Sequence, residues 1–135
     1  MTIEIKKISC IKDIQTPFSK EYPYLKIEFF DMPHNWGETT RKAHRYSAGF
    51  KISAIETKKH TQNMIHFNRW MKAGQVEEQM KEQFGLFTQI YRRNGYSWVE
   101  TAGTDELSLD ELNEIGKKSV LNYRNNLWIE REILL

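Results

Sequence analysis

The chain has 135 residues, of which 39% are hydrophobic and 28% are charged, and its formal net charge is +2. This length and composition predict one globular domain, residues 1–135, and exclude a wholly disordered chain. The single cysteine, Cys10, excludes an internal disulfide and a thiolate zinc site. The sequence shows neither a signal peptide nor an apolar run that could span a bilayer, so we expect a cytoplasmic protein without a membrane partner.

The first part of the chain predicts a strand, a helix and a second strand. Apolar and polar residues alternate over residues 3–6, as in a half-buried strand. Ile14, Phe18 and Tyr22 then recur every four residues, which predicts a short amphipathic helix. Alternation over residues 24–30 predicts the second strand.

A second unit of the same order follows a polar stretch, after which residues 48–55 are expected to form a further strand. Alternation predicts a strand at 65–67, and Val76, Met80 and Phe84 form a four-residue stripe typical of a helix. Residues 86–92 then predict a strand. Asn94-Gly95 predicts a hairpin with a type I′ turn that leads into a strand at 96–101.

The two units align without a gap, which suggests an internal repeat of residues 3–30 and 65–92. Ile3 corresponds to Ile65, and apolar helix positions match at the same spacing. The strands after the helices need a shift of one residue, because Ile27 falls opposite the polar Gln89. The alternative is that any two units of this kind share such a pattern.

The last third predicts a helix and an ambiguous segment. Ser108 and Glu111 form a capping-box pattern, and the helix is expected to end near Lys118, with Gly116 weakening its end. Residues 127–135 fit a strand or a helix. If they form a strand, residues 64–134 have a ferredoxin-like order.

These elements predict a single α+β domain with one mixed β-sheet and helices mainly on one face. Each strand–helix–strand unit is expected to make a right-handed crossover, which would place its two strands parallel. The expected core consists of apolar residues on the inward faces of these elements: Ile5, Ile14, Phe18, Leu25, Ile27, Phe29, Phe67, Val76, Met80, Phe84, Leu86, Ile90, Trp98 and Leu112.

Two parts of the chain resemble a family of proteins. The first part is residues 18–30 (FSKEYPYLKIEFF). The second part consists of residues 84–86, 91–105 (YRRNGYSWVETAGTD) and 109–116. They resemble an uncharacterised family of small bacterial α/β proteins with no known activity. The resemblance implies a bacterial α/β domain and carries no catalytic residue over to this chain.

Metal binding and catalysis have little support in the sequence. None of the four histidines is paired at the helical i,i+4 spacing, and only Asp31, His34 and Glu38 lie close enough in sequence for one loop to gather them. Nucleophile elbows and phosphate-binding loops are absent from the sequence. We therefore assign no catalytic residue, metal or cofactor, although a small enzyme of unassigned class stays an alternative.

A single-stranded nucleic-acid-binding domain is another alternative. The hairpin at residues 91–98 combines basic and aromatic residues, and residues 41–46 add a second such patch. Aromatic side chains can stack on unpaired bases while cations contact phosphates. The candidate residues are Arg92, Arg93 and Tyr96 on the hairpin, and Arg41, Arg45 and Tyr46 in the second patch.

The favoured hypothesis is a protein-interaction or scaffold module. Residues 127–135 contain six large apolar residues, a composition that suits a contact with another protein or with a second copy, as in a homodimer. The alternative is that this segment packs on its own sheet. The candidate interface residues are Leu127, Trp128, Ile129, Ile133 and Leu134.

Overall fold

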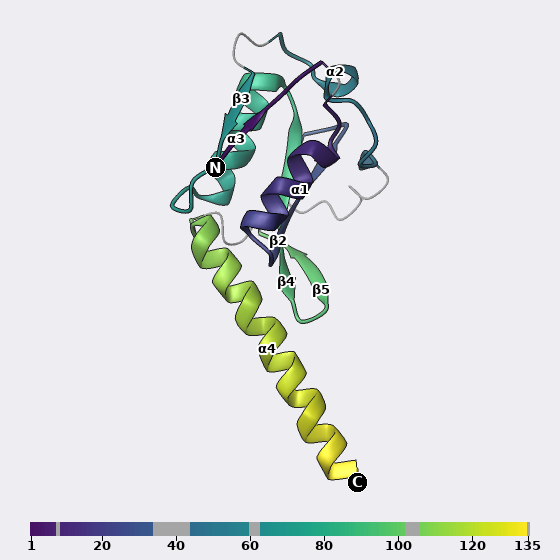
Figure 1. Cartoon of the computed structure of the whole chain (residues 1–135), viewed down its shortest axis with the longest axis vertical. Coiled ribbons are helices and arrows are strands. Elements are labelled where there is room, and N and C mark those ends of the chain that lie inside the picture. Colours follow the sequence, from purple (N-terminus) through teal and green to yellow (C-terminus); the bar gives the residue numbers. More distant parts are fainter. Residues whose placement is uncertain (8, 34–43, 60–62, 102–105, 135) are drawn as a thin grey trace.

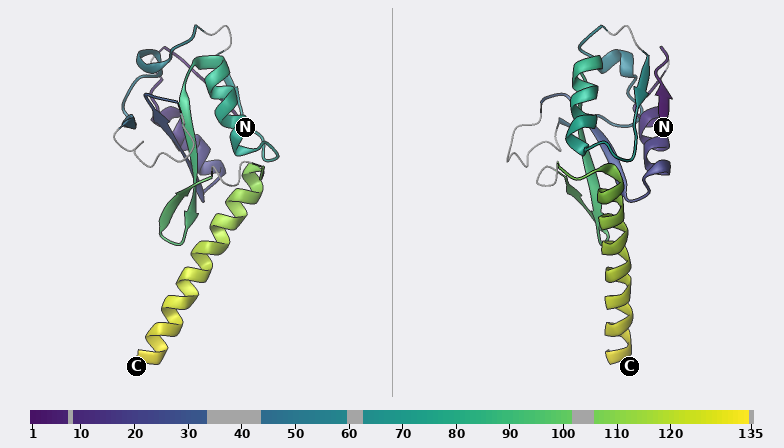
Figure 2. Two further views of the ribbon diagram at one scale, coloured as in Figure 1. Left: turned by 180° about the vertical axis from the view of Figure 1, so that it is seen from behind. Right: turned by 90° about the vertical axis from the view of Figure 1, so that its left-hand side faces the viewer.

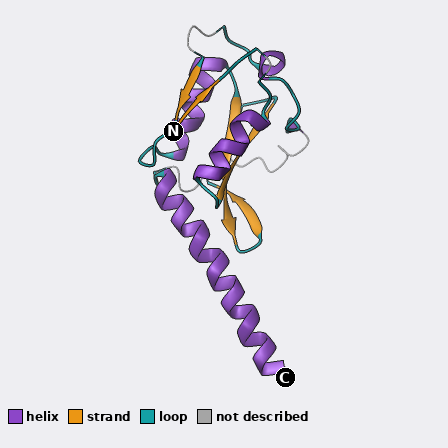
Figure 3. Cartoon of the chain, viewed as in Figure 1, coloured by secondary structure: helices purple, strands orange, loops and turns teal. Residues whose placement is uncertain are grey.

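The computed structural model contains helices and strands along the whole described part of the chain (Figures 1 and 3). It describes residues 1–7, 9–33, 44–59, 63–101 and 106–134, of which residues 128–134 are described by their backbone alone. The elements form a single α+β domain, as predicted. They are β1 (Thr2–Glu4), α1 (Lys12–Glu21), β2 (Leu25–Phe30), α2 (Ile52–Ile55), β3 (Met64–His66), α3 (Ala73–Phe84), β4 (Phe87–Asn94), β5 (Ser97–Glu100) and α4 (Leu109–Leu134).

The strands form two antiparallel sheets, so the prediction of one mixed sheet with parallel strands is wrong. β1 pairs with β3, and a second sheet has the order β2-β4-β5. Every strand pair in the described part of the chain is antiparallel. The crossover prediction assumed that β1 pairs with β2 and β3 with β4, whereas each of these strands pairs with its counterpart in the other unit. The ferredoxin-like order is also wrong, because a helix occupies residues 127–134.

This pairing matches each of these strands with its counterpart in the other unit. Ile3 lies directly opposite Ile65 in the β1–β3 ladder, and Ile27 lies opposite Ile90 in the β2–β4 ladder. The second pair includes the one-residue shift that the sequence alignment required. α1 packs against β2 as α3 packs against β4. Two related units would give this arrangement, and the internal repeat itself stays a prediction.

The core lies between the helices and the strands. Phe18 of α1 and Met80 of α3 are fully buried, and the Phe18 ring contacts that of Phe67 with 5.6 Å between centroids. Burial of these apolar stripes is the main source of stability for both helices. All the predicted core residues are buried except Trp98, which is only half-buried on β5.

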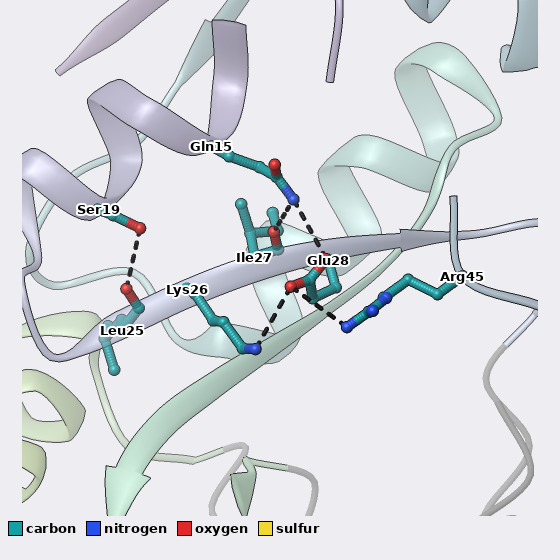
Figure 4. A network of polar contacts seen from close by, with 7 residues as sticks. All are labelled: Gln15, Ser19, Leu25, Lys26, Ile27, Glu28 and Arg45. Carbon is teal, nitrogen blue, oxygen red and sulfur yellow. Dashed lines mark hydrogen bonds and ion pairs between the residues drawn. The ribbon is translucent and has the colours of Figure 1, made fainter. Parts of the chain in front are cut away.

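Side chains of α1 cover the free edge of β2 (Figure 4). The Gln15 side-chain amide donates a hydrogen bond to the Ile27 carbonyl at 2.9 Å, and the Ser19 hydroxyl donates one to the Leu25 carbonyl at 3.1 Å. Arg45 forms a bridge to Phe30 further along the same edge. The exposed backbone groups of an edge strand are a template for unwanted pairing, and here the carbonyls of Leu25, Ile27 and Phe29 already accept hydrogen bonds.

Two local predictions need correction. Residues 52–55 form the short helix α2 rather than part of a strand, although Lys51 forms a bridge to Cys10. The hairpin is confirmed, but Asn94 pairs with Ser97, so the turn residues are Gly95 and Tyr96. Only Gly95 has a positive φ, 61°. This is the pattern of a type II′ turn, which needs glycine only at its first central position.

The helix α4 is much longer than predicted, because it continues past Lys118 to Leu134. Gly116 does not end it. A Cβ atom at this position would lie 2.9 Å from the Tyr24 Cβ and 3.1 Å from the Tyr24 carbonyl oxygen. Glycine at 116 therefore lets the helix approach the start of β2 closely.

The predicted capping box at the start of α4 is confirmed and allows a test. The Glu111 N–H donates to the Ser108 hydroxyl at 3.1 Å, and the Ser108 N–H donates to the Glu111 carboxylate at 3.3 Å. We expect Ser108→Ala to lower the free energy of unfolding by about 1 kcal/mol, measured by urea denaturation. Ser53→Ala, which removes an exposed hydroxyl in α2, should change it far less. Equal effects would contradict the cap.

Candidate interaction surface

The first half of α4 is fixed to the β2–β4–β5 sheet. Leu109, Leu112 and Val120 are buried along one face of the helix. The Ser119 hydroxyl accepts a hydrogen bond from the Gly95 N–H at 3.1 Å and lies 3.0 Å from the Arg93 carbonyl oxygen. These contacts hold the helix against the hairpin, so both elements contribute to one surface.

After Val120, the helix leaves the body of the domain. Figure 1 shows α4 extending past the hairpin and away from both sheets, and both views in Figure 2 agree. Three large apolar side chains on this part are exposed: Leu121 (44%), Tyr123 (41%) and Leu127 (37%). The Tyr123 ring contacts that of Tyr96, which is itself 59% exposed at the hairpin tip, with 4.6 Å between centroids.

The predicted interface residues lie on this projecting helix. Leu127 is exposed, and its segment is helical, which resolves the ambiguity between strand and helix. The backbones of Trp128, Ile129, Ile133 and Leu134 continue the helix, and their side chains lie outside the described part of the structure. The helical backbone excludes a strand in this segment.

The structure places the two arginines of the hairpin on opposite faces of the sheet. Arg93 and Trp98 lie opposite each other on β4 and β5, with the Arg93 guanidinium carbon 4.0 Å from the Trp98 ring centroid. Arg92 lies opposite Leu25 and faces the other side of the sheet. Tyr96 is at the tip. The hairpin therefore presents cations on both of its faces.

The second predicted patch is not joined to the hairpin. Arg45 lies beside β2, where its guanidinium is 4.0 Å from the Glu28 carboxylate (Figure 4), and β4 separates this edge from β5. The Tyr46 ring packs against Phe50 instead, with 5.3 Å between centroids. Arg41 lies outside the described residues.

Comparison with known proteins adds no further information. No protein-family model, curated protein or solved structure matches this chain. The resemblance to a family of small bacterial proteins therefore stays a prediction. In the part of the chain that the structure describes, no helix is long and apolar enough to cross a membrane.

The histidines do not form a metal site in the described part of the chain. His44 pairs with Asp31 at 3.0 Å, and His66 lies 3.1 Å from the Thr2 hydroxyl. Across residues 1–7, 9–33, 44–59, 63–101 and 106–127, no three His, Cys, Asp or Glu side chains are placed to hold a metal ion. His34, Glu38 and His60 lie outside these ranges.

Sequence reasoning missed several cations beside the hairpin. The Lys26 ammonium of β2 lies 4.9 Å from the Trp98 ring centroid, on the face that also carries Arg93. Lys117, Lys118 and Arg124 are exposed on α4, next to the hairpin in space. The sequence did indicate a basic segment here, because residues 115–129 contain no acidic residue. This segment was overlooked because the helix was expected to end near Lys118.

Proposed function

We propose that this protein is a protein-interaction module that associates with a second copy of itself through residues 121–134 of α4. The observation that carries the proposal is the exposure of Leu121, Tyr123 and Leu127 on a helical segment that projects beyond both sheets (Figure 1). Tyr123 contacts the hairpin tip through Tyr96 and Gly95. A projecting helix of this length is marginally stable alone in water, and large exposed apolar residues usually mark an interface.

A second copy is the partner that the helix suits best. In a two-fold contact, the same face covers itself, so two projecting helices laid antiparallel would each shield the other's Tyr123 and Leu127, which lie one turn apart on one face of the helix.

The proposal predicts a dimer that depends on Leu127. We expect the full-length chain to sediment as a dimer in analytical ultracentrifugation. Leu127→Asp should raise the dissociation constant at least about tenfold, because it places a charge in the apolar contact. Trp70→Asp is the matched control, because Trp70 is 71% exposed on the main body and its replacement should leave the dimer intact.

Two outcomes would contradict self-association. One is a wild-type chain that stays monomeric up to the highest concentrations that remain soluble. The other is a dimer that Leu127→Asp does not weaken while Trp70→Asp does, since the contact would then lie on the body of the domain. Circular dichroism of both variants should confirm that the fold is retained.

A further inference from the structure

Positive charge is concentrated on the hairpin and the adjoining part of α4. Residues 91–99 and 115–129 contain no aspartate or glutamate, and together they carry five basic side chains. The whole chain has a net charge of only +2, so the remaining residues are net negative. The five basic side chains are Arg92 and Arg93 on the hairpin and Lys117, Lys118 and Arg124 on α4. The three α4 cations and Tyr96 at the hairpin tip are called the hairpin–α4 surface.

The fold brings these two segments together. A Cβ atom on Gly116 would lie 3.5 Å from the Arg93 nitrogen, and Ser119 lies 3.0 Å from the Arg93 carbonyl oxygen. Lys117 and Lys118 lie between these two contact positions in sequence and are exposed. Because successive helix residues are about 100° apart, both lysines lie beside the line of contact, on the part of α4 that adjoins the hairpin. A polyanion that follows α4 can therefore reach the hairpin tip as well.

The cations of α4 are not neutralised by neighbouring carboxylates. Among the described residues, no carboxylate lies within ion-pair distance of Lys117, Lys118 or Arg124. The closest acidic residues in sequence are Glu114, one turn before Lys118, Glu130, directly after residue 129, and Glu100, at the end of β5. Each reduces the positive potential at one end of the surface and leaves its centre unopposed.

Exposed aromatic rings lie within the same basic surface. Tyr96 lies at the hairpin tip, and its ring contacts that of Tyr123 in an edge-to-face arrangement with an interplanar angle of 66°. Because Tyr96 remains 59% exposed, an unpaired base can still reach its ring. Base stacking on aromatic side chains beside phosphate-binding cations is the common way in which proteins hold single strands.

We propose that the hairpin–α4 surface binds single-stranded nucleic acid. Lys117, Lys118 and Arg124 contact phosphates along the strand, and Tyr96 stacks on a base. A single strand fits better than a duplex, because bases in a duplex are stacked on one another and unavailable to a tyrosine ring. This surface overlaps the proposed self-association segment at residues 121–124. The phosphate contacts use Lys117 and Lys118, whereas the dimer variant is at Leu127, so the two functions can be tested separately.

The test is fluorescence anisotropy with labelled oligothymidylate of about 20 nucleotides, long enough to span the surface. The wild-type chain should bind, and the logarithm of its association constant should fall with the logarithm of salt concentration with a slope of about −2, as three phosphate contacts to a single strand require. Lys117→Ala/Lys118→Ala should reduce the slope by about 1 unit. Lys58→Ala/Lys59→Ala, at the other end of the molecule, should leave it unchanged (Figure 1).

The role of the ring is tested with Tyr96→Ala. This variant should weaken binding at least about fivefold with no change in the salt slope, because stacking releases no counterions. Duplex DNA of the same length and heparin serve as competitors, and both should compete less well than unlabelled oligothymidylate.

Three results would overturn the proposal. They are the absence of binding at low salt, a salt slope that the lysine pair on α4 does not change, and equal competition by heparin together with unchanged binding by Tyr96→Ala. The Leu127→Asp variant should bind oligothymidylate with the same salt slope as the wild-type chain. That result would support nucleic-acid binding by this surface even if the chain is monomeric.

Discussion

Met80→Asp should lower the free energy of unfolding by about 3–5 kcal/mol, a large part of the ~5–15 kcal/mol that is typical of a native protein. Met80 is fully buried on the inner face of α3, between Val76 and Phe84. An aspartate there would place a carboxylate in an apolar environment, or would force it to stay protonated. Thermal and urea denaturation followed by circular dichroism would measure the loss.

Met64→Asp provides the matched control, since Met64 on β3 is 38% exposed and a carboxylate there remains in water. It should cost less than about 1 kcal/mol. A normal midpoint for Met80→Asp would mean that α3 turns a different face to the core.

Gly85→Ala is expected to cost about 2–4 kcal/mol, because it combines backbone strain with a collision. Gly85 ends α3 with φ of 62°, a left-handed conformation that side chains disfavour. A Cβ atom would also collide with the Thr57 hydroxyl oxygen and lie 2.9 Å from the Lys58 nitrogen. The Thr57 hydroxyl donates a hydrogen bond to the Gly85 carbonyl at 2.8 Å, which the collision would break.

Gly49→Ala is the corresponding control. A Cβ atom at this position meets no atom within 4 Å, and the backbone has no left-handed φ. The expected change in unfolding free energy is within about 1 kcal/mol, in either direction. If both glycine variants proved equally stable, the close contact between the end of α3 and residues 57–58 would be disproved.

The sequence predicted local structure well, because short-range patterns determine it. The stripe of Val76, Met80 and Phe84, the left-handed Gly85 and the turn at Gly95 are each fixed by their immediate neighbours. Strand pairing could not be predicted in the same way. The alternation in residues 24–30 is satisfied equally by a parallel or an antiparallel neighbour, so only the tertiary structure decides between them.

The candidate surface was predictable only in part. The basic and aromatic hairpin was visible in the sequence, and so was the apolar composition of residues 127–135. Their relation was not, since it depends on Gly116 allowing α4 to approach Tyr24 and then continue as a helix. Glycine usually weakens a helix, so the sequence pattern alone favoured an early end. The exposed lysines after Gly116 were missed for this reason.

The pairing of each strand with its counterpart has a consequence for synthesis on the ribosome. When residues 1–33 emerge, β1 and β2 lack their partners, because β3 and β4 are translated later. Neither half can complete a sheet by itself, so the nascent chain must wait for β4 before it gains its main cooperative contacts. A chain cut in the segment between α2 and β3 would yield two pieces that need each other to fold.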